Sequence, residues 1–415
     1  MPEAYIIDAV RTPRGVGKVG KGALAHMHPQ HLAATVLAAL RERNALDTTD
    51  VDDVIWSTSS QRGTQGAIGR FATLDAGFDR TVSGVTLDRF CGGGITAASL
   101  AAGQIKAGFE DVVIAGGTEM TSLLATHQQQ DRENGTSAGF YAGNARLQAK
   151  SPWAHQGVAA DAIASMEGIS REDLDAFGAE SQRRAARAIA EGRFARAIVP
   201  VIGEDGTLIL DHDEHPRPET TAESLAALKP SFEQIADAVI DREGTTFRKL
   251  INSVYPDLDI KALHHAGTSS GNVDGAAALL LASGEYAAAH GLKPRGRIVA
   301  SVNLGDDPTL MLNAPVPAVR KLLARANMTV DDIDLFEINE AFAVVVEKFI
   351  RDLKLDREKV NVNGGAIALG HPIGATGAIL VGTLLDELER RDLRRGVVTM
   401  CAAGGMAPAM IIERV

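Results

Sequence analysis

Short hydrophobic runs alternate with amphipathic stretches at both ends of the chain, which is typical of an α/β fold. In the first part, the runs predict strands near 5–10, 53–57, 82–86 and 111–115, with helices near 31–43, 66–76 and 92–107. From residue 296 the alternation returns, and strands are expected near 298–302, 335–338, 360–362, 397–400 and 409–413. The part between, about 122–262, is more polar and irregular, with a charged helix near 171–191. We interpret it as an excursion packed over a buried sheet.

The two α/β regions share a layout. In each, a strand leads to a glycine-rich turn, a helix of small residues and a further strand that ends in Gly-Gly. We interpret this as an internal duplication. It would place Cys91 and His371 at corresponding helix starts, related by a pseudo-twofold axis.

Composition narrows the class of protein. The 415 residues are 45% hydrophobic and 23% charged, as in a globular protein of two or three domains. A net charge of −11 argues against a nucleic-acid-binding protein, although a few local cations can still hold a phosphate. No apolar run approaches the roughly 20 residues of a membrane span, and the first residues look like a strand rather than a signal peptide. The two distant cysteines predict reduced thiols and a cytoplasmic location.

Cys91 and Cys401 are the first candidates for chemistry. Cys91 stands where a strand turns into a helix, and the positive end of a helix favours a thiolate. The alternative is a small buried hydrophobic residue. Cys401 also lies where a strand runs into a glycine-rich turn. The pattern suggests two thiols meeting at one site.

Three polar residues lie in similar turns. His371, flanked by glycine-rich segments, is either a capping or core histidine or a group that a ligand can approach closely. Asn339 is either a helix N-cap or a polar anchor in a cleft. The adjacent Glu340 is either a general acid or a carboxylate favoured at a helix start.

Two polar loops have weaker signals. The turn 264–275 could line a ligand channel or be an ordinary capped loop. Residues 211–215 contain metal-ligand types without a catalytic spacing, so we expect a solvated loop and no metal site.

Together these segments resemble the thiolase family over essentially the whole chain. The specific matches are Arg11-Thr12-Pro13, the Cys91 turn, Gly116-Gly117-Thr118-Glu119, Asn339-Glu340-Ala341-Phe342, Gly370-His371-Pro372 and the Cys401 turn. The resemblance implies an α/β fold: a five-layer αβαβα sandwich of two similar halves with an inserted loop domain. The expected N-terminal half is 1–121 with about 250–285, the loop domain 122–250, and the C-terminal half 286–415.

The resemblance also implies an acyltransferase with assigned roles. Cys91 would be the nucleophile that takes the acyl group, His371 would activate it, and Cys401 would be the acid/base. Asn339, through a water, and His371 would hold one thioester oxygen. The backbone N–H groups of Cys91 and Ala403 would form a second oxyanion hole. Coenzyme A (CoA) is then a substrate, with no permanently bound cofactor.

The remaining positions that the resemblance assigns concern binding. Relatives contact CoA through residues that match positions in the excursion and in the pocket lining: Arg217, Ser224, Phe232, His155, Ala266, Ser270 and Met311. An arginine near phosphate and apolar walls along pantetheine suit such a ligand.

Departures from the family pattern, among them His265-Ala266-Gly267-Thr268 where Thr-Ala-Gly-Asn is common, concern substrate preference rather than reaction type. The triple glycine Gly92-Gly93-Gly94 is expected to loosen the helix start and leave room beside the nucleophile. The second oxyanion turn carries Ala402-Ala403, and Gln156 replaces a common methionine.

The resemblance favours a degradative 3-ketoacyl-CoA thiolase of fatty-acid β-oxidation, because segment 208–230 looks like those enzymes, including β-subunits of trifunctional complexes. An alternative is a biosynthetic acetyl-CoA acetyltransferase that makes acetoacetyl-CoA. A carrier-protein condensing enzyme is disfavoured by Cys401. A non-catalytic CoA-binding relative would be expected to lose one of the four reactive residues. A homodimer or homotetramer is implied, and a hydratase/dehydrogenase α-subunit as partner is left open. We hypothesise that the longer segment 232–264 shapes an acyl tunnel or a partner surface.

Overall fold

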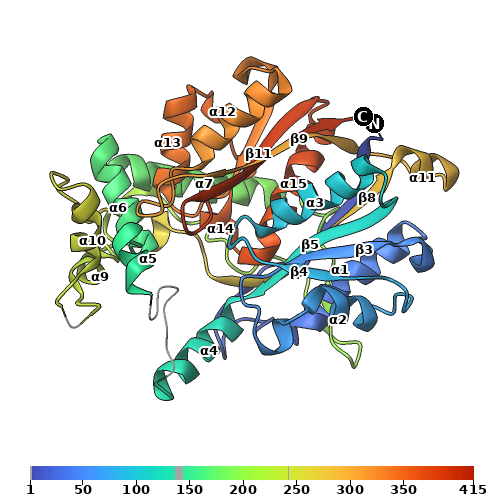
Figure 1. The fold of residues 1–415 in the computed structure, drawn as a ribbon, viewed down its shortest axis with the longest axis horizontal. Coiled ribbons are helices and arrows are strands. Elements are labelled where there is room, and N and C mark those ends of the chain that lie inside the picture. Colours follow the sequence, from blue (N-terminus) through green and yellow to red (C-terminus); the bar gives the residue numbers. More distant parts are fainter. Residues whose placement is uncertain (1, 136–143, 242) are drawn as a thin grey trace.

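Two halves of the same design are joined along one pair of strands (Figure 1). The computed structural model describes residues 2–135, 144–241 and 243–415. The strand order of the first half is β4 (Val85–Leu87), β3 (Asp53–Ser57), β5 (Val112–Met120), β8 (Val273–Ser283), β1 (Ala4–Arg11). The order of the second is β10 (Leu335–Ile338), β11 (Arg395–Thr399), β12 (Met406–Arg414), β9 (Gly296–Gly305). Strands β1 and β9 pair antiparallel, with Tyr5 opposite Arg297.

The pairing directions repeat as well. Strands β3 and β5 are parallel, and β5–β8 and β8–β1 are antiparallel. In the second half β10 and β11 are parallel, and β11–β12 and β12–β9 are antiparallel. The matching order and directions support the duplication inferred from sequence.

Helices form the other three layers. Helices α3 (Gly93–Ala107) and α15 (Ile373–Arg390) lie in the middle, and each contacts strands of both halves. On the outer side of the first half, α1 (Pro29–Arg43) and α2 (Ile68–Asp75) cover the strands, and α12 (Pro315–Ala326) covers the second half with α13 (Ala343–Leu353) beside it. Every residue of β5 and β8 is buried, because helices cover both faces. This arrangement confirms the predicted five-layer αβαβα sandwich.

The two middle helices approach so closely that glycine is required at their contact. A Cβ on Gly94 would lie 2.9 Å from the Cα of Gly377, and one on Gly93 would lie 1.8 Å from Ser57 Oγ. A Cβ on Gly92 would lie 2.8 Å from Pro408 Cδ. The expectation that these glycines leave free room beside Cys91 is therefore wrong, because neighbouring atoms already occupy that space.

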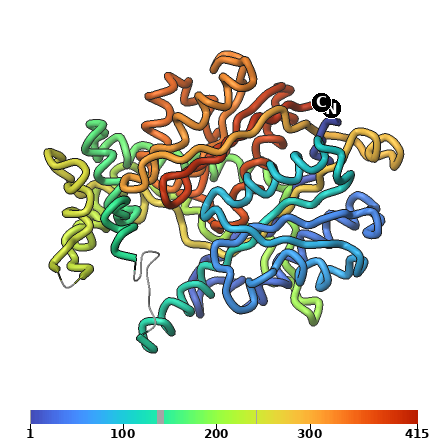
Figure 2. The backbone as a smooth tube through the Cα atoms, in the orientation of Figure 1, coloured from blue at the N-terminus to red at the C-terminus, as the bar shows by residue number. Residues whose placement is uncertain are grey.

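The excursion between β5 and β8 is mostly helical. Its elements are α4 (Thr121–Glu133), α5 (Ala145–Lys150), α6 (Gln156–Glu167), α7 (Arg171–Ala190), α8 (Ala222–Ala226), α9 (Glu233–Asp237) and α10 (Phe247–Val254), with a small hairpin of β6 (Val201–Ile202) and β7 (Leu208–Leu210). Helices α6, α9 and α10 gather at one end of the molecule (Figure 2). Helix α7 packs on α13 and on the short α14 (Ala366–Leu369). The predicted domain boundaries at about 121, 250 and 285 stay predictions, and 136–143 and 242 lie outside the described residues.

Four short elements differ from the sequence prediction. The strand expected at 82–86 is β4, which begins three residues later, and 360–362 form only isolated bridges, one of which joins Val360 to Phe336. That bridge is parallel, as is the β3–β4 pairing, so 360–362 stand where β4 stands in the first half. The pattern gave no sign of β2 (Gly15–Val16) or α11 (Gly284–Ala289). Such short segments have too little periodicity to be distinguished.

None of the helices in the described ranges combines the length and apolar character needed to span a membrane.

Candidate active site

A cavity of about 620 Å³ opens where the excursion meets the two halves. It brings together nine of the residues predicted from sequence: Cys91, His155, Arg217, Phe232, Ala266, Ser270, His371, Cys401 and Ala403. The two cysteines are both free and buried. Residues more than 300 positions apart thus share one site, as the two-thiol hypothesis requires.

Cys91 and His371 occupy equivalent places in the two halves. Helix α3 begins at Gly93 and helix α15 at Ile373, so each reactive residue stands two positions before its helix. Each follows a residue with positive φ, Phe90 at 49° and Gly370 at 91°. The left-handed turn redirects the chain just before the helix, and both side chains reach the same cavity.

A hydrogen-bond chain fixes the tautomer of His371. The hydroxyl of Thr376 donates to the carbonyl of Pro372 at 3.0 Å. Its oxygen must therefore accept from Nδ1–H of His371, which lies 2.6 Å away. Nε2 is then left with its lone pair. Burial and the nearby Arg14 lower the pKa of His371 to about 4, so the ring is a neutral base near pH 7.

The structure corrects the expectation that the helix start makes Cys91 a thiolate. Cys91 precedes the N-cap Gly92, and burial raises the pKa of its thiol to about 12. The backbone N–H groups of Cys91 and Ala403 act in the opposite direction but do not outweigh the loss of water. The thiol is neutral at rest, and its activation needs a base that accepts the proton.

The Cys401 turn closes the site from the second half. Ala402 and Met406 exchange backbone hydrogen bonds of 2.7 and 3.1 Å across the turn. Cys401 is buried, and burial together with the charge of Cys91 raises the pKa of its thiol. Two neutral thiols therefore face one cavity, and the Ala403 N–H is aimed at Cys91.

Asn339 lies behind His371 rather than in the cavity wall. Its Nδ2 is 3.5 Å from Nε2 of His371. Its Oδ1 is buried and has no hydrogen-bond partner within the described part of the chain. A buried amide oxygen without a protein partner suits a bound water. The neighbouring Glu340 faces away from the cavity and accepts from Ser181, Asn361 and the Ile367 N–H, which indicates a structural carboxylate.

Aromatic rings build one wall of the cavity. His155 caps helix α6, and its ring lies 5.6 Å from Phe232 and 5.8 Å from Phe247. Phe232 in turn meets Phe342 edge-on at 5.8 Å. Phe247 belongs to α10, so the longer segment 232–264 supports this wall from behind. Its predicted role in forming a tunnel or a partner surface stays a prediction.

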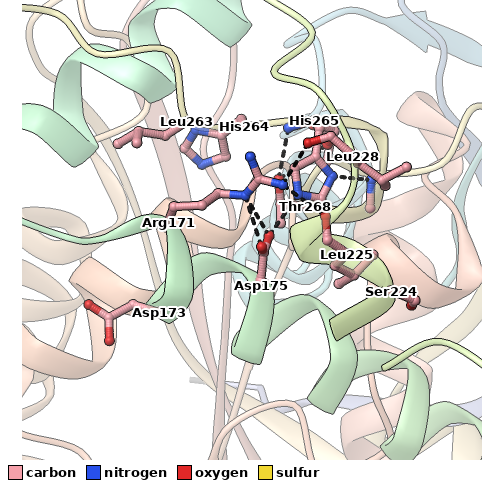
Figure 3. Close-up of polar contacts among 12 residues, drawn as sticks. Arg171, Asp173, Asp175, Ser224, Leu225, Leu228, Leu263, His264, His265 and Thr268 are labelled. Atoms are coloured by element: carbon pink, nitrogen blue, oxygen red, sulfur yellow. Dashed lines mark hydrogen bonds and ion pairs between the residues drawn. The ribbon is translucent and has the colours of Figure 1, made fainter. Parts of the chain in front are cut away.

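A buried ion cluster supports another part of the cavity lining, and its contacts are drawn in Figure 3. Asp175 on α7 accepts from Arg171 Nε at 2.8 Å and from His265 Nε2 at 2.7 Å. Arg171 also donates to the carbonyls of Leu225 and Leu228. Both leucines line the cavity, as do residues next to His265. Helix α8 and the turn at 265–268 are thus held to α7, and the turn lines the cavity. That it lines a ligand channel stays a prediction.

The segment 211–215 is not the solvated loop expected from sequence. Asp213 is buried and forms an ion pair with Arg11 at 2.7 Å, and Glu214 Oε2 accepts from the N–H of Val16 at 2.8 Å. His215 donates to the Ala368 carbonyl and lines the cavity. Only Asp211 and His212 are exposed. The acidic residues looked solvated because their partners are distant in sequence.

Two predicted contacts lie outside the cavity lining, and some lining residues were not predicted as contacts. Ser224 is exposed and serves in the capping box of α8, and Met311 is fully buried beside the lining residue Leu312. The unpredicted lining residues include Gln182, His215 and Leu228. Gln182 accepts from the N–H of Arg217 at 2.8 Å, which places that arginine at the mouth. Nothing in the pattern of α7 marks Gln182 as a cavity residue.

The duplicated fold, with a pair of thiols and one imidazole at its shared cavity, is the arrangement expected of an acyltransferase. Family models for the thiolase N-terminal and C-terminal domains match residues 4–239 and 292–414. The chain belongs to the thiolase family and has its CoA-dependent acyltransferase activity, with CoA as substrate.

Relatives cover the whole chain. A 3-oxoadipyl-CoA/3-oxo-5,6-dehydrosuberyl-CoA thiolase of Escherichia coli is 41% identical over 100% of both chains. A 3-ketoacyl-CoA thiolase of Aeromonas hydrophila is 38% identical, again over 100% of both. The crystal structure of the Bacillus anthracis acetyl-CoA acetyltransferase is similar with a TM-score of 0.83 and 35% identity, over 100% of this chain and 99% of that one.

Proposed function

We propose that this enzyme is a degradative thiolase that cleaves 3-ketoacyl-CoA with free CoA to give acetyl-CoA and a shortened acyl-CoA. The observation that carries the proposal is the convergence of Cys91, His371 and Cys401 on one cavity. Cleavage needs a nucleophile at the ketone carbon and a separate acid at the departing carbon, and two thiols supply these.

In the first half-reaction, His371 Nε2 takes the proton of the Cys91 thiol as Sγ bonds to the ketone carbon. The N–H groups of Cys91 and Ala403 stabilise the oxyanion. The carbon–carbon bond then breaks, and Cys401 protonates the departing enolate of acetyl-CoA. His371, now protonated, and Asn339 through a water hold the thioester oxygen of that enolate.

In the second half-reaction, the thiol of free CoA gives its proton to Cys401, and its sulfur attacks the acyl group on Cys91. The shortened acyl-CoA leaves, Cys91 Sγ recovers a proton from His371, and the cycle closes. The covalent intermediate predicts ping-pong kinetics.

Two features of the cavity suit CoA. Arg217 stands at the mouth with no ion-pair partner among the described residues, and the Phe232 ring and Leu225 offer apolar surface behind it. A free cation near phosphates and an apolar wall along pantetheine fit this ligand.

The physiological setting extends the proposal. We infer a role in fatty-acid β-oxidation, in the cytoplasm, as a homodimer or homotetramer, with a hydratase/dehydrogenase α-subunit as an optional partner. The names of the relatives suggest two alternative functions. One is thiolysis of dicarboxylic 3-oxoacyl-CoA, and the other is the biosynthetic reaction of an acetyl-CoA acetyltransferase.

Thiolysis of 3-ketoacyl-CoA from C4 to C16 and of 3-oxoadipyl-CoA, with Cys91→Ala as control, tests the proposal. We expect a Cys91-dependent kcat/KM that peaks at medium or long unbranched chains. A peak at 3-oxoadipyl-CoA would replace this substrate class by the dicarboxylic one. Activity confined to acetoacetyl-CoA would favour the biosynthetic role.

A further inference from the structure

Behind the catalytic histidine lies a buried cation, Arg14, in the loop between β1 and β2. Its side chain is buried, and Nη1 donates to the carbonyl of Gly370 at 3.1 Å. Gly370 directly precedes His371 and has a φ of 91°. On its other side, the N–H of His371 donates to Gly271 at 2.8 Å. The backbone that presents the imidazole is therefore fixed from two directions, one of which is Arg14.

The position of Arg14 is itself fixed. Its backbone N–H donates to Asp213 Oδ1 at 2.8 Å, and that carboxylate already forms a two-pronged ion pair with Arg11 at 2.7 and 2.9 Å. The Nε of Arg14 finds no hydrogen-bond partner in the described part of the chain. A buried guanidinium that is only partly satisfied is costly. Arg11 already neutralises Asp213. The other carboxyl groups that act electrostatically on Arg14 are the buried Glu337 and Glu340, and burial raises the pKa of both, so neither is a full countercharge for Arg14.

We propose that Arg14 is a positioning residue for the catalytic pair, which anchors the turn of His371 through the Gly370 carbonyl and keeps a positive charge beside the imidazole. The inference rests on the proposed role of His371 as the base. A neighbouring cation disfavours the imidazolium form, and the pKa of His371 is lowered accordingly, by burial first and by Arg14 second. The ring is thereby kept ready to accept the Cys91 proton in mildly acidic solution.

Other charged groups around this turn are directed elsewhere. Glu119 accepts from the Gly374 N–H and from Ser59, and Asp274 accepts from Ser122. His215 donates to the carbonyl of Ala368. Other titratable groups nearby are the two neutral thiols and the buried Glu337 and Glu340, which act electrostatically on Arg14. Arg14 is the charged group that shifts the equilibrium of His371.

The test compares Arg14→Met, which removes the charge and the anchor, with Arg14→Lys, which keeps the charge. The matched control is Arg184→Met, because Arg184 is also buried, and its Nη1 donates to the carbonyl of Val360 away from the cavity. The readout is the pH profile of kcat/KM for thiolysis of acetoacetyl-CoA. With Arg14→Met we expect the acidic limb to move to higher pH by roughly one unit. Arg14→Lys and Arg184→Met should leave the limb in place.

An unmoved limb in Arg14→Met, or an equal shift in Arg184→Met, would overturn the proposal. If Arg14→Met does not fold, Arg14→Gln takes its place with the same expectation. A second readout does not need activity: NMR of the histidine rings, with His371 assigned by the loss of its signal in His371→Asn. An unchanged His371 midpoint on removal of the charge would refute the inference, even if the enzyme cleaved no 3-ketoacyl-CoA and the proposed function itself failed.

Discussion

The two halves of this enzyme agree in topology and differ in the segment that comes after the central strand. In the second half, β11 passes through the tight turn 400–405 directly into β12, and this turn carries Cys401 and Ala403. In the first half, β5 continues to Met120, and the chain makes the helical excursion before it returns as β8. At the corresponding strand end stands Glu119, which bonds to Ser59 and to the Gly374 N–H.

This difference separates chemistry from binding. The shared part of the design gives two equivalent helix starts, which hold Cys91 and His371. The unshared parts supply the second thiol on one side and the walls for the ligand on the other. Under the proposed function, a duplicated scaffold thus presents the reactive groups symmetrically, whereas an asymmetric substrate would be bound by elements that only one half possesses.

The largest expected effect comes from exchanging the two thiols for alanine. Each variant, Cys91→Ala and Cys401→Ala, should lose roughly 1,000-fold or more in kcat for thiolysis. They should differ in the partial reaction: with acetyl-CoA alone, Cys401→Ala still forms an acyl-enzyme, and Cys91→Ala does not. Mass spectrometry of the intact protein detects the bound acetyl group. Acylation of Cys91→Ala would mean that the roles are misassigned.

A single added methyl group should disrupt the contact between α3 of the first half and α15 of the second. Gly94→Ala places a Cβ against Gly377 and should destabilise the fold by about 3 kcal/mol. Gly103→Ala, on the same helix with nothing within 4 Å, should stabilise it by up to about 1 kcal/mol. Urea denaturation measures both. Equal effects at the two positions would show that the helices do not depend on this close approach.

The tautomer of His371 can be disturbed without touching the ring. Thr376→Val removes the oxygen that accepts from Nδ1–H, so the imidazole can rotate or change tautomer. We expect kcat to fall roughly 10- to 100-fold with little change in KM. Thr376→Ser keeps the oxygen and should remain near wild type. A rise in KM with kcat unchanged would indicate a binding role for Thr376 instead.

The smallest expected effects are two pH dependences of folding stability, one from each half. Because the pKa of folded His371 is about 4, below its ordinary value of 6.5, stability should fall as pH drops below 6.5, by about 2 kcal/mol at pH 5. Because the pKa of folded Cys91 is about 12, above its ordinary value of 9.0, stability should fall as pH rises past 9, by about 1 kcal/mol at pH 10. Urea midpoints measured across pH test both expectations. His371→Asn should remove the fall in stability at acidic pH, and Cys91→Ala should remove the fall at alkaline pH. If stability still falls with the same slope in the variant that lacks the group, other groups must cause that pH dependence.

Sequence reasoning reached the α/β class and the duplicated layout because long elements have clear periods, and it reached the five-layer sandwich through the resemblance to the thiolase family. The duplication, the placement of Cys91 and His371 and the shared cavity all derive from local patterns that recur in order. The features that it missed depend on contacts between distant segments. The sequence predicts a solvated Asp213, but the side chain forms an ion pair with Arg11. It also predicts free space at the glycines after Cys91, but Gly377 and Ser57 occupy that space.

The protonation of Cys91 shows the same limit. A helix start nearby argues for a thiolate, and that local effect is present through the backbone N–H groups. The burial that outweighs it comes from segments distant in sequence, including second-half residues that share a hydrophobic cluster with Cys91, and no local pattern contains these. Cavity residues such as Gln182 could not be predicted for a related reason, because the sequence of a helix does not show which of its faces lines a cavity.

The close packing of α3 against α15 has a consequence for how the enzyme loses activity in denaturant. The two reactive residues are held by the innermost layer of the molecule, whereas the ligand walls depend on peripheral helices α8, α9 and α10. Mild denaturant should therefore weaken CoA binding first, while the cysteine and imidazole keep their spacing. Reactivity of Cys91 toward a small alkylating agent should change only when the whole fold unfolds.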